Sequence, residues 1–388
     1  MSASPPPIPL FEPRIDGNEW KYVKDCLDTN WISSVGAYVR KFEESVARRL
    51  GVKHAVATVN GTAALHIALM ISGVEADDEV IMPSVTFIAP ANAVRYLGAR
   101  PVFMDAEPRF FQIDVEKTLD FLNKGCRWSK GALRNKSTGR RVRALMPVDV
   151  LGHPADVRPL LAAARKFGLA FVQDASESLG SRYRGAATGR TADVSCLSFN
   201  GNKLVTTGGG GMLLTDDDRK AARARHLTTQ AKDDPVEYIH GEIGYNYRLT
   251  NVLAAIGLAQ LEKLDGTVAA KRRIASRYKA ALEGVPGVLP MREAPWGKST
   301  FWMYTVLIDE RKYGEDSRAV LRRLAGLGIM TRPLWQPMHL SPAHAGCQAY
   351  RCETAEKIYR DALSIPSSVG LTSGQQKRVV GAIARPRA

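Results

Sequence analysis

Short apolar runs alternate with helical patterns along residues 54–175, and the helical patterns are stopped by a glycine. Runs of strand character occupy 54–60, 78–83, 101–105, 142–150 and 169–175. Helical patterns lie between them at 62–71, 88–97 and 155–167, followed closely by Gly73, Gly98 and Gly168. Glycine readily ends a helix, and apolar strands joined by helices form a parallel sheet with crossover helices on its faces. The sequence therefore predicts an α/β fold.

The pattern changes after residue 190. Two strand-like runs, 193–199 and 210–217, are separated by a loop rich in glycine and threonine, and a helix or helix pair is predicted over 251–284. The remaining residues mix a strand at 301–309 with an amphipathic helix at 318–328. We therefore expect two domains: a large α/β domain over 1–260, with a mostly parallel mixed sheet, and a smaller α+β domain over 261–388.

The chain carries a net charge of +15, part of which is concentrated in one segment. Residues 124–143 contain eight Lys or Arg and no acid, and they interrupt the α/β alternation like an added loop or short hairpin. A solvated basic loop is the first interpretation, and help in binding an anionic substrate is the second. No zinc-finger spacing, aromatic RNA-binding signature or basic heptad helix is present, so nucleic acid is not an expected partner.

Hydropathy and cysteine usage bear on location. No run of about 20 apolar residues exists to cross a membrane, and the proline-rich start has neither the basic region nor the apolar run of a signal peptide. Five scattered cysteines, Cys347 and Cys352 among them, form no zinc-binding pattern. These features predict a cytoplasmic protein with reduced thiols and no metal site.

The most informative stretch is SFNGNKLVTTGGGGM at 198–212, which places Lys203 between two strands beside a run of glycines. A lone lysine here would ordinarily be solvated. A lysine that binds pyridoxal phosphate needs two companions, a carboxylate for the pyridine nitrogen and a phosphate cradle. Asp174 ends a strand at its carboxyl end, where open α/β sheets bind ligands, although such an aspartate also serves as a turn or cap. The segment 60–63 opens a helix and offers N–H groups to phosphate, although it is also an ordinary helix start.

Five segments together carry a family resemblance: NGTAALHIAL, PSVTFIA, QDASESLG, SFNGNK and GYNYRLT. Their order and spacing resemble those of the DegT/StrS-type nucleotide-sugar aminotransferases. The resemblance extends from EWKYVKDCLDTNWISSVG at 19–36 to RPLWQPMHL at 332–340. It implies the aspartate-aminotransferase-like fold (PLP fold type I) and pyridoxal 5'-phosphate as cofactor.

The same resemblance assigns roles to individual residues. Lys203 matches the lysine that forms the Schiff base with the cofactor and then shuttles a proton, and Asp174 matches the acid that keeps the pyridine nitrogen protonated. Phe87 matches the aromatic side chain that stacks on the cofactor ring; the alternative is a core phenylalanine. The remaining matches are phosphate ligands, namely Ser198 and the cradle of Gly61, Thr62 and Ala63.

Further positions match residues near the substrate or the partner subunit. Asn246 matches a phosphate contact given by the other subunit, which implies a homodimer with shared active sites. Trp31 and Ser33 match a segment near the substrate. Arg248 suits a phosphate or carboxylate of the substrate, or equally a dimer interface. His339 also matches a segment near the substrate, but we expect it to be structural and leave it out of the catalytic set.

Glu177 departs from the many members that carry His or Gln at this position. Glutamate there resembles the branch that acts at C4 of nucleotide-linked 4-keto-6-deoxy sugars, of the perosamine, bacillosamine or legionaminic acid type. The predicted reaction takes an amino group from L-glutamate, leaving 2-oxoglutarate. Two alternatives share the fold: a sugar dehydratase, in which histidine typically replaces the lysine, and a non-catalytic regulator, which carries a helix-turn-helix module that this N-terminus is too short to hold.

Overall fold

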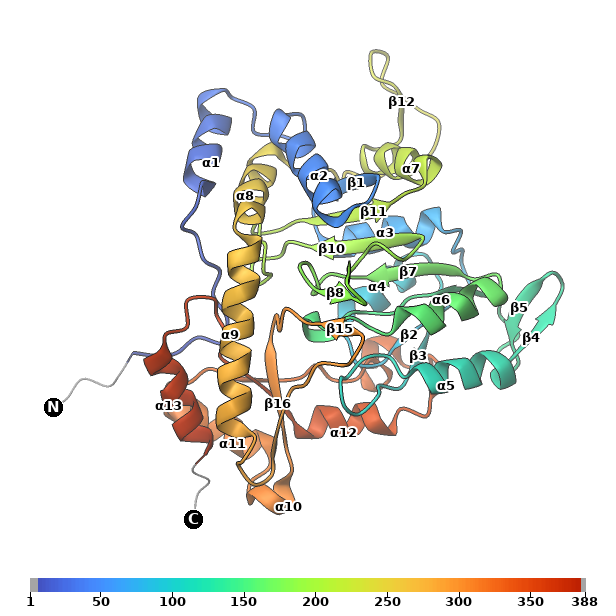
Figure 1. The fold of residues 1–388 in the computed structure, drawn as a ribbon. Coiled ribbons are helices and arrows are strands. Elements are labelled where there is room, and N and C mark those ends of the chain that lie inside the picture. The colour runs from blue at the N-terminus through green and yellow to red at the C-terminus, as the bar shows by residue number, and fades with distance from the viewer. Residues whose placement is uncertain (1–5, 385–388) are drawn as a thin grey trace.

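The computed structural model describes residues 6–384 and is built around one large sheet (Figure 1). Its eight strands follow the order β1-β11-β10-β7-β6-β2-β3-β18. Their bounds are β1 (His54–Thr58), β2 (Glu79–Pro83), β3 (Arg100–Met104), β6 (Val142–Leu145), β7 (Ala170–Asp174), β10 (Val194–Ser198), β11 (Gly211–Thr215) and β18 (Ala349–Tyr350). β11 runs antiparallel to both neighbours, and every other pair in the sheet is parallel. The predicted α/β fold with a mostly parallel mixed sheet is confirmed.

Crossover helices cover the sheet as the sequence predicts. They are α3 (Gly61–Ile71), α4 (Ile88–Tyr96) and α6 (Val157–Lys166); α7 (Asp218–Thr228), which follows β11, was not predicted. α3 begins at Asn60, whose side chain accepts a hydrogen bond from the N–H of Ala63, and most of its residues are buried. This cap and the burial of the helix fix the N-terminus of α3 at the carboxyl end of β1.

One predicted strand is shorter than expected. The run 142–150 forms a strand only over β6, and Val150–Gly152 turns into a 3-10 helix. Pro147 has no N–H to give to a neighbouring strand, which favours the end of regular pairing here. The expectation of one strand over 142–150 was therefore wrong.

The C-terminal part contains a second, antiparallel sheet with the order β14-β16-β19-β17. Its strands are β14 (Val288–Pro290), β16 (Tyr304–Ile308), β17 (Arg332–Pro333) and β19 (Ala362–Ile365), flanked by α11 (Ser317–Gly326), α12 (Glu353–Asp361) and α13 (Ser373–Ile383). α8 (Asn251–Glu262) and α9 (Leu264–Leu282) form the predicted helix pair, and Figure 1 shows them running from the large sheet down to this second sheet. The boundary between 260 and 261 stays a prediction; β18, from the C-terminal part, joins the large sheet.

Two hairpins project from the body. The basic segment 124–143 forms β4 (Cys126–Ser129) and β5 (Ala132–Asn135), so it is a short hairpin. β12 (Lys232–Asp234) and β13 (Ile239–His240) form a second hairpin, at the top of Figure 1. The sequence analysis predicted neither this hairpin nor the helices α1 (Glu19–Asp28) and α2 (Ala37–Leu50), which pack on α8.

No helix in the described range 6–384 is long and apolar enough to cross a membrane. Within the same range, no three His, Cys, Asp or Glu side chains are grouped so as to hold a metal ion. The five cysteines are free thiols. The expected absence of a signal peptide rests on an N-terminal stretch of which residues 1–5 lie outside the described range. The cytoplasmic location also stays a prediction.

Candidate active site

A cavity of about 380 Å³ lies at the carboxyl ends of β7 and β10, beside the N-terminus of α3. Parallel α/β sheets bind ligands at this edge, because loops and helix N-termini converge there. Seven of the predicted site residues line the cavity: Gly61, Thr62, Phe87, Asp174, Glu177, Ser198 and Lys203. The fold thus brings together side chains that lie up to 142 positions apart in the sequence.

Lys203 is the central side chain of this cavity. Its side chain is only 12% exposed, with Nζ 3.7 Å from Oε1 of Glu177. The ring of Trp302 lies below the amine, with its centroid 3.8 Å from Nζ. Burial lowers the pKa of Lys203 below the ordinary lysine value, against the opposing effect of the carboxylates of Glu177 and Asp174. The site therefore favours the neutral amine, which is the nucleophilic form.

The two carboxyl groups of the cavity are both buried. Burial raises the pKa of Glu177 to about 7, and its Oε2 accepts a hydrogen bond from the N–H of Leu151 at 2.7 Å. Burial also raises the pKa of Asp174, which accepts a hydrogen bond from the N–H of Ser176 at 3.0 Å. A buried carboxylate is stabilised when a cation comes to lie beside it, so Asp174 is suited to a protonated ring nitrogen.

The phosphate cradle is formed where α3 approaches β10. A Cβ at Gly61 would lie 2.9 Å from Cβ of Ser198, so this close approach requires glycine. Within residues 6–384, the N–H groups of Gly61 and Thr62 have no hydrogen-bond partner, as is expected at a helix N-terminus. These donors, the helix dipole and the Ser198 hydroxyl together suit a phosphate.

Three aromatic side chains also line the cavity: Phe87, Trp302 and Trp335. Phe87 is 52% exposed and meets Trp335 edge to face at 6.2 Å between ring centroids. Trp335 in turn stacks on Trp302 at 6.4 Å, and Trp302 donates from Nε1 to the carbonyl of Asn202 at 2.6 Å. The exposure of Phe87 favours its predicted contact with the cofactor ring over the alternative of a core position.

The sequence analysis missed Trp302, Trp335 and Thr86 as site residues. Both tryptophans come from the C-terminal part, whose position over the large sheet no local pattern reveals. Thr86 directly precedes Phe87, and its Oγ1 is a buried polar atom without a partner in the described part of the chain. Such an orphaned hydroxyl on a cavity wall is consistent with a ligand that bonds to it.

The other predicted residues lie outside this cavity. Ala63 is buried within α3, and Asn246 is exposed on a segment that bridges to Thr229. Trp31 and Ser33 are exposed before α2, in a loop held by Asn251 through the carbonyl of Trp31.

Arg248 and His339 are each bonded within the chain. Arg248 forms a two-contact ion pair with Glu43, away from the cavity. His339 lies between Ser84, 2.6 Å from its Nδ1, and Glu356, 3.1 Å from its Nε2, in agreement with a structural role.

Comparisons with known proteins agree with this fold and site. A model of the DegT/DnrJ/EryC1/StrS aminotransferase family matches residues 13–384. The GDP-perosamine synthase of Caulobacter vibrioides is 41% identical over 379 residues, covering 97% of this chain and 98% of that protein. A putative pyridoxal phosphate-dependent aminotransferase of Bacillus subtilis, EpsN, is 37% identical over 96% of this chain and 94% of its own. The crystal structure of DesI with its TDP-sugar product has a TM-score of 0.87 at 29% identity, covering 98% and 92%.

Fold, site and comparisons define a pyridoxal phosphate-dependent sugar aminotransferase. The chain belongs to the DegT/DnrJ/EryC1/StrS aminotransferase family. The predicted family, fold type, enzyme class and cofactor are confirmed, and the dehydratase and the regulator are not favoured.

Proposed function

We propose that this enzyme transfers the amino group of L-glutamate to C4 of a GDP-linked 4-keto-6-deoxy sugar. The observation that carries the proposal is the cavity in which Lys203 lies 3.7 Å from a buried glutamate instead of the His or Gln of many members. The relative from Caulobacter vibrioides, 41% identical, is named for a GDP-linked amino sugar, which favours GDP over UDP. The net reaction exchanges the amino group of glutamate for the carbonyl oxygen of the sugar, giving 2-oxoglutarate and the amino sugar.

The residues of the cavity fit pyridoxal phosphate. Gly61, Thr62 and Ser198 would hold its phosphate, Asp174 its ring nitrogen, Phe87 its ring face and Lys203 its aldehyde carbon. When bound, the cofactor supplies an electron sink that lets a C–H bond beside the amino group ionise.

The chain itself moves the proton. Nζ of Lys203, whose pKa burial lowers, accepts a proton at the carbon that loses it and returns it at the carbon that gains it. Glu177, with a pKa raised to about 7, is placed to hold a proton beside this amine near neutral pH. Trp302 covers one side of Nζ and excludes water from it.

We also propose that the active enzyme is a homodimer in which Asn246 completes the partner's site. Asn246 is exposed and lies outside its own chain's cavity, which supports a role across an interface. The nearby β12–β13 hairpin exposes apolar side chains, Val236, Tyr238 and Ile239 among them, that a second copy would cover. Trp31, Ser33 and Arg248 remain proposed contacts of the acceptor or the interface.

Absorbance of the holoenzyme tests the reaction in two steps. We expect L-glutamate to bleach the visible band of the bound cofactor, and a GDP-4-keto-6-deoxy sugar to restore it. The same experiment with UDP- and TDP-linked keto sugars tests the nucleotide, since GDP should restore the band at the lowest concentration. A band that glutamate leaves unchanged would refute the donor, and equal restoration by all three nucleotides would refute the preference for GDP.

A further inference from the structure

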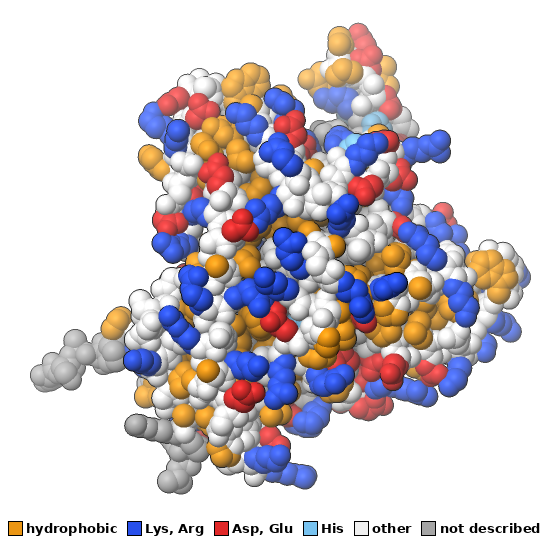
Figure 2. All heavy atoms as spheres, in the orientation of Figure 1, with side chains coloured by type: hydrophobic (Ala, Val, Ile, Leu, Met, Phe, Trp, Pro, Cys, Tyr) orange, Lys and Arg blue, Asp and Glu red, His pale blue; other side chains and the backbone are white. Residues whose placement is uncertain are grey.

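A second, larger hollow of about 650 Å³ lies on another face of the molecule. It is bounded by α9, the end of α2 and the small sheet formed by β8 (Arg182–Tyr183), β9 (Ala186–Ala187) and β15 (Gly297–Lys298). Figure 2 shows Lys and Arg side chains recurring across this face, over α9, β8 and β15. It shares no lining residue with the cofactor cavity, and we call it the basic groove.

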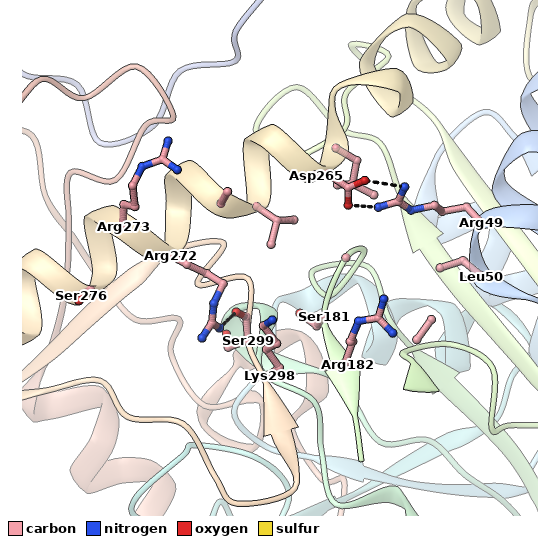
Figure 3. Close-up of a pocket in the computed structure, with 15 residues that line it drawn as sticks. Arg49, Leu50, Ser181, Arg182, Asp265, Arg272, Arg273, Ser276, Lys298 and Ser299 are labelled. Atoms are coloured by element: carbon pink, nitrogen blue, oxygen red, sulfur yellow. Dashed lines mark hydrogen bonds and ion pairs between the residues drawn. The ribbon is translucent and has the colours of Figure 1, made fainter. Parts of the chain in front are cut away.

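Five cationic side chains line the basic groove: Arg49, Arg182, Arg272, Arg273 and Lys298 (Figure 3). Arg49 pairs with Asp265 at one end, and Arg272 pairs with Glu293 at 2.6 Å. Arg182 and Lys298 have no carboxylate within 4 Å among residues 6–384. Arg273 of α9 also lines the groove and likewise has no carboxylate within 4 Å among these residues. Asp265 and Glu293 are thus already paired, and three cations, Arg182, Arg273 and Lys298, have no carboxylate partner among residues 6–384.

Two of these three cations, Arg182 and Lys298, are directly opposite one another in the small sheet. Lys298 of β15 and Arg182 of β8 are register partners in an antiparallel pair, which places their side chains on the same face. Like charges directly opposite destabilise a strand pair. Arg182 donates to the carbonyl of Gly185 at 2.9 Å, but neither side chain has a carboxylate within 4 Å among residues 6–384. An anion bound between them removes the repulsion and gains charge-assisted hydrogen bonds.

The shape of the groove narrows the kind of anion. Leu50, Leu264 and Val268 add an aliphatic surface on the side of α2 and α9, while Arg182 and Lys298 lie on the small sheet. A single phosphate would fill only part of 650 Å³. A ligand with two phosphates and an organic part can contact the cationic side chains with its phosphates and the aliphatic surface with its organic part.

We propose that the basic groove is a second ligand site, which binds the diphosphate of a nucleoside diphosphate between Arg182 and Lys298. The argument rests on the groove alone and not on the proposed acceptor. The two strands lead to the cofactor cavity, since Arg182 follows Glu177 by five residues and Lys298 precedes Trp302 by four. The N–H of Thr300 also bonds to Oγ of Ser181 at 3.1 Å, joining the two segments. A ligand that fixes this strand pair therefore acts on two segments that line the cofactor cavity.

Acetylation of lysines in the holoenzyme, read by mass spectrometry, tests the site directly. Lys298 is exposed, so we expect it to react freely, and GDP to slow its reaction while leaving Lys130 of the β4–β5 hairpin unchanged. Arg182→Gln should raise the GDP concentration needed for protection by about tenfold or more, the value of one lost charge-assisted contact. Inorganic pyrophosphate in place of GDP separates the two sources of a diphosphate: equal protection assigns the site to the bare diphosphate, and weaker protection assigns it to the nucleotide.

The matched control is Arg127→Gln, which removes an exposed arginine opposite Arg134 in another hairpin. If it weakens protection as much as Arg182→Gln does, the effect is general screening and the proposal fails. The proposal also fails if neither anion protects Lys298, or if Lys298 is unreactive without ligand because a second copy covers it. An equal rise in the KM for the keto sugar in Arg182→Gln would place the groove within the substrate site and refute a second one.

Discussion

Two buried lysines of this chain, Lys203 and Lys271, lie in opposite kinds of surroundings. Lys203 opens onto a cavity, lies 3.7 Å from Glu177 and has Asp174 nearby. Lys271 of α9 is only 1% exposed, and its amine donates to the carbonyl and hydroxyl oxygens of Ser367, with no carboxylate partner in the described part of the chain. Burial lowers the pKa of both amines.

The two lysines show that what lowers the pKa of an amine is not sufficient to make that amine reactive. Desolvation alone makes a lysine neutral, but chemistry also needs space for a ligand and a group to exchange protons with. Lys271 satisfies the first condition and neither of the others, so we interpret it as a structural lysine.

The largest expected effect comes from removing the reactive amine. Lys203→Ala should lower kcat by about 10³-fold or more, because no other amine reaches the cavity to move the proton. Measured turnover of the keto sugar checks this, with Lys271→Met as the matched variant that should keep its activity. Comparable losses in both variants would contradict the distinction between the two lysines.

The next effect concerns stability at Lys271. Lys271→Ala should lower the free energy of unfolding by about 3 kcal/mol, since it leaves a cavity and two unsatisfied oxygens of Ser367. Lys271→Met should lose less, because its side chain fills the space. Urea unfolding of the two variants beside the wild type measures both values.

The pH dependence sharpens this second prediction. Burial lowers the pKa of Lys271 in the folded chain, so below the ordinary lysine pKa the unfolded chain takes up a proton there more readily than the folded chain. The contribution of the buried Lys271 to the free energy of unfolding is present above the ordinary lysine pKa. It declines as the pH falls towards the lowered pKa that Lys271 has in the folded chain. Lys271→Met should flatten the pH dependence of the unfolding midpoint, and an unchanged slope would show that Lys271 is not buried as a neutral amine.

Sequence patterns predicted the large sheet better than the part of the cavity that Trp302 and Trp335 line. Glycine stops, apolar runs and the helix start at residues 60–63 are local signals, and they predicted the alternation of parallel strands and helices from β1 to β7. Asp174 ends β7, Glu177 follows it in the next turn, and Lys203 lies in the loop after β10, the parallel neighbour of β7, so their convergence follows from the topology. Trp302 and Trp335 reach the cavity only because the C-terminal sheet packs over it, and no local pattern encodes that contact. For the same reason, nothing in the helical pattern of 251–284 distinguishes the buried Lys271 from its exposed neighbours.

A smaller effect is expected when the Glu177 carboxylate beside Lys203 is removed, which leaves Lys203, like Lys271, without that neighbouring acid. In Glu177→Gln the amine loses a carboxylate that raises its pKa, so the acid limb of kcat/KM against pH should move to lower pH. The rate above pH 7 should also fall about tenfold, because the side chain can no longer hold and release a proton. Glu177→Asp, which keeps the carboxyl group, should recover part of the rate. An unchanged profile would mean that the two groups do not interact.

The smallest effect concerns Asp149, which mirrors Lys271 with the charge reversed. This carboxyl is fully buried, and its partners are neutral donors: Ser178 Oγ at 2.6 Å, Gln173 Nε2 and the N–H of Ala155. It holds the turn that carries Asp174 and Glu177 in place, since Ser178 follows both. Burial raises the pKa of Asp149 to about 6.

A carboxyl whose pKa is raised by folding stabilises the protein at acid pH, and this contribution is lost as the pH rises through about 6. Asp149→Asn removes this pH dependence of the unfolding free energy. It also places an amide N–H donor where the Nε2 group of Gln173 needs an acceptor. The variant should therefore be less stable than the wild type at pH 5, with the gap in unfolding free energy closing by about 1 kcal/mol at pH 7. A gap that stays constant between these values would mean that Asp149 is ionised throughout, and that burial without an opposite charge does not suffice to neutralise an acid in this fold.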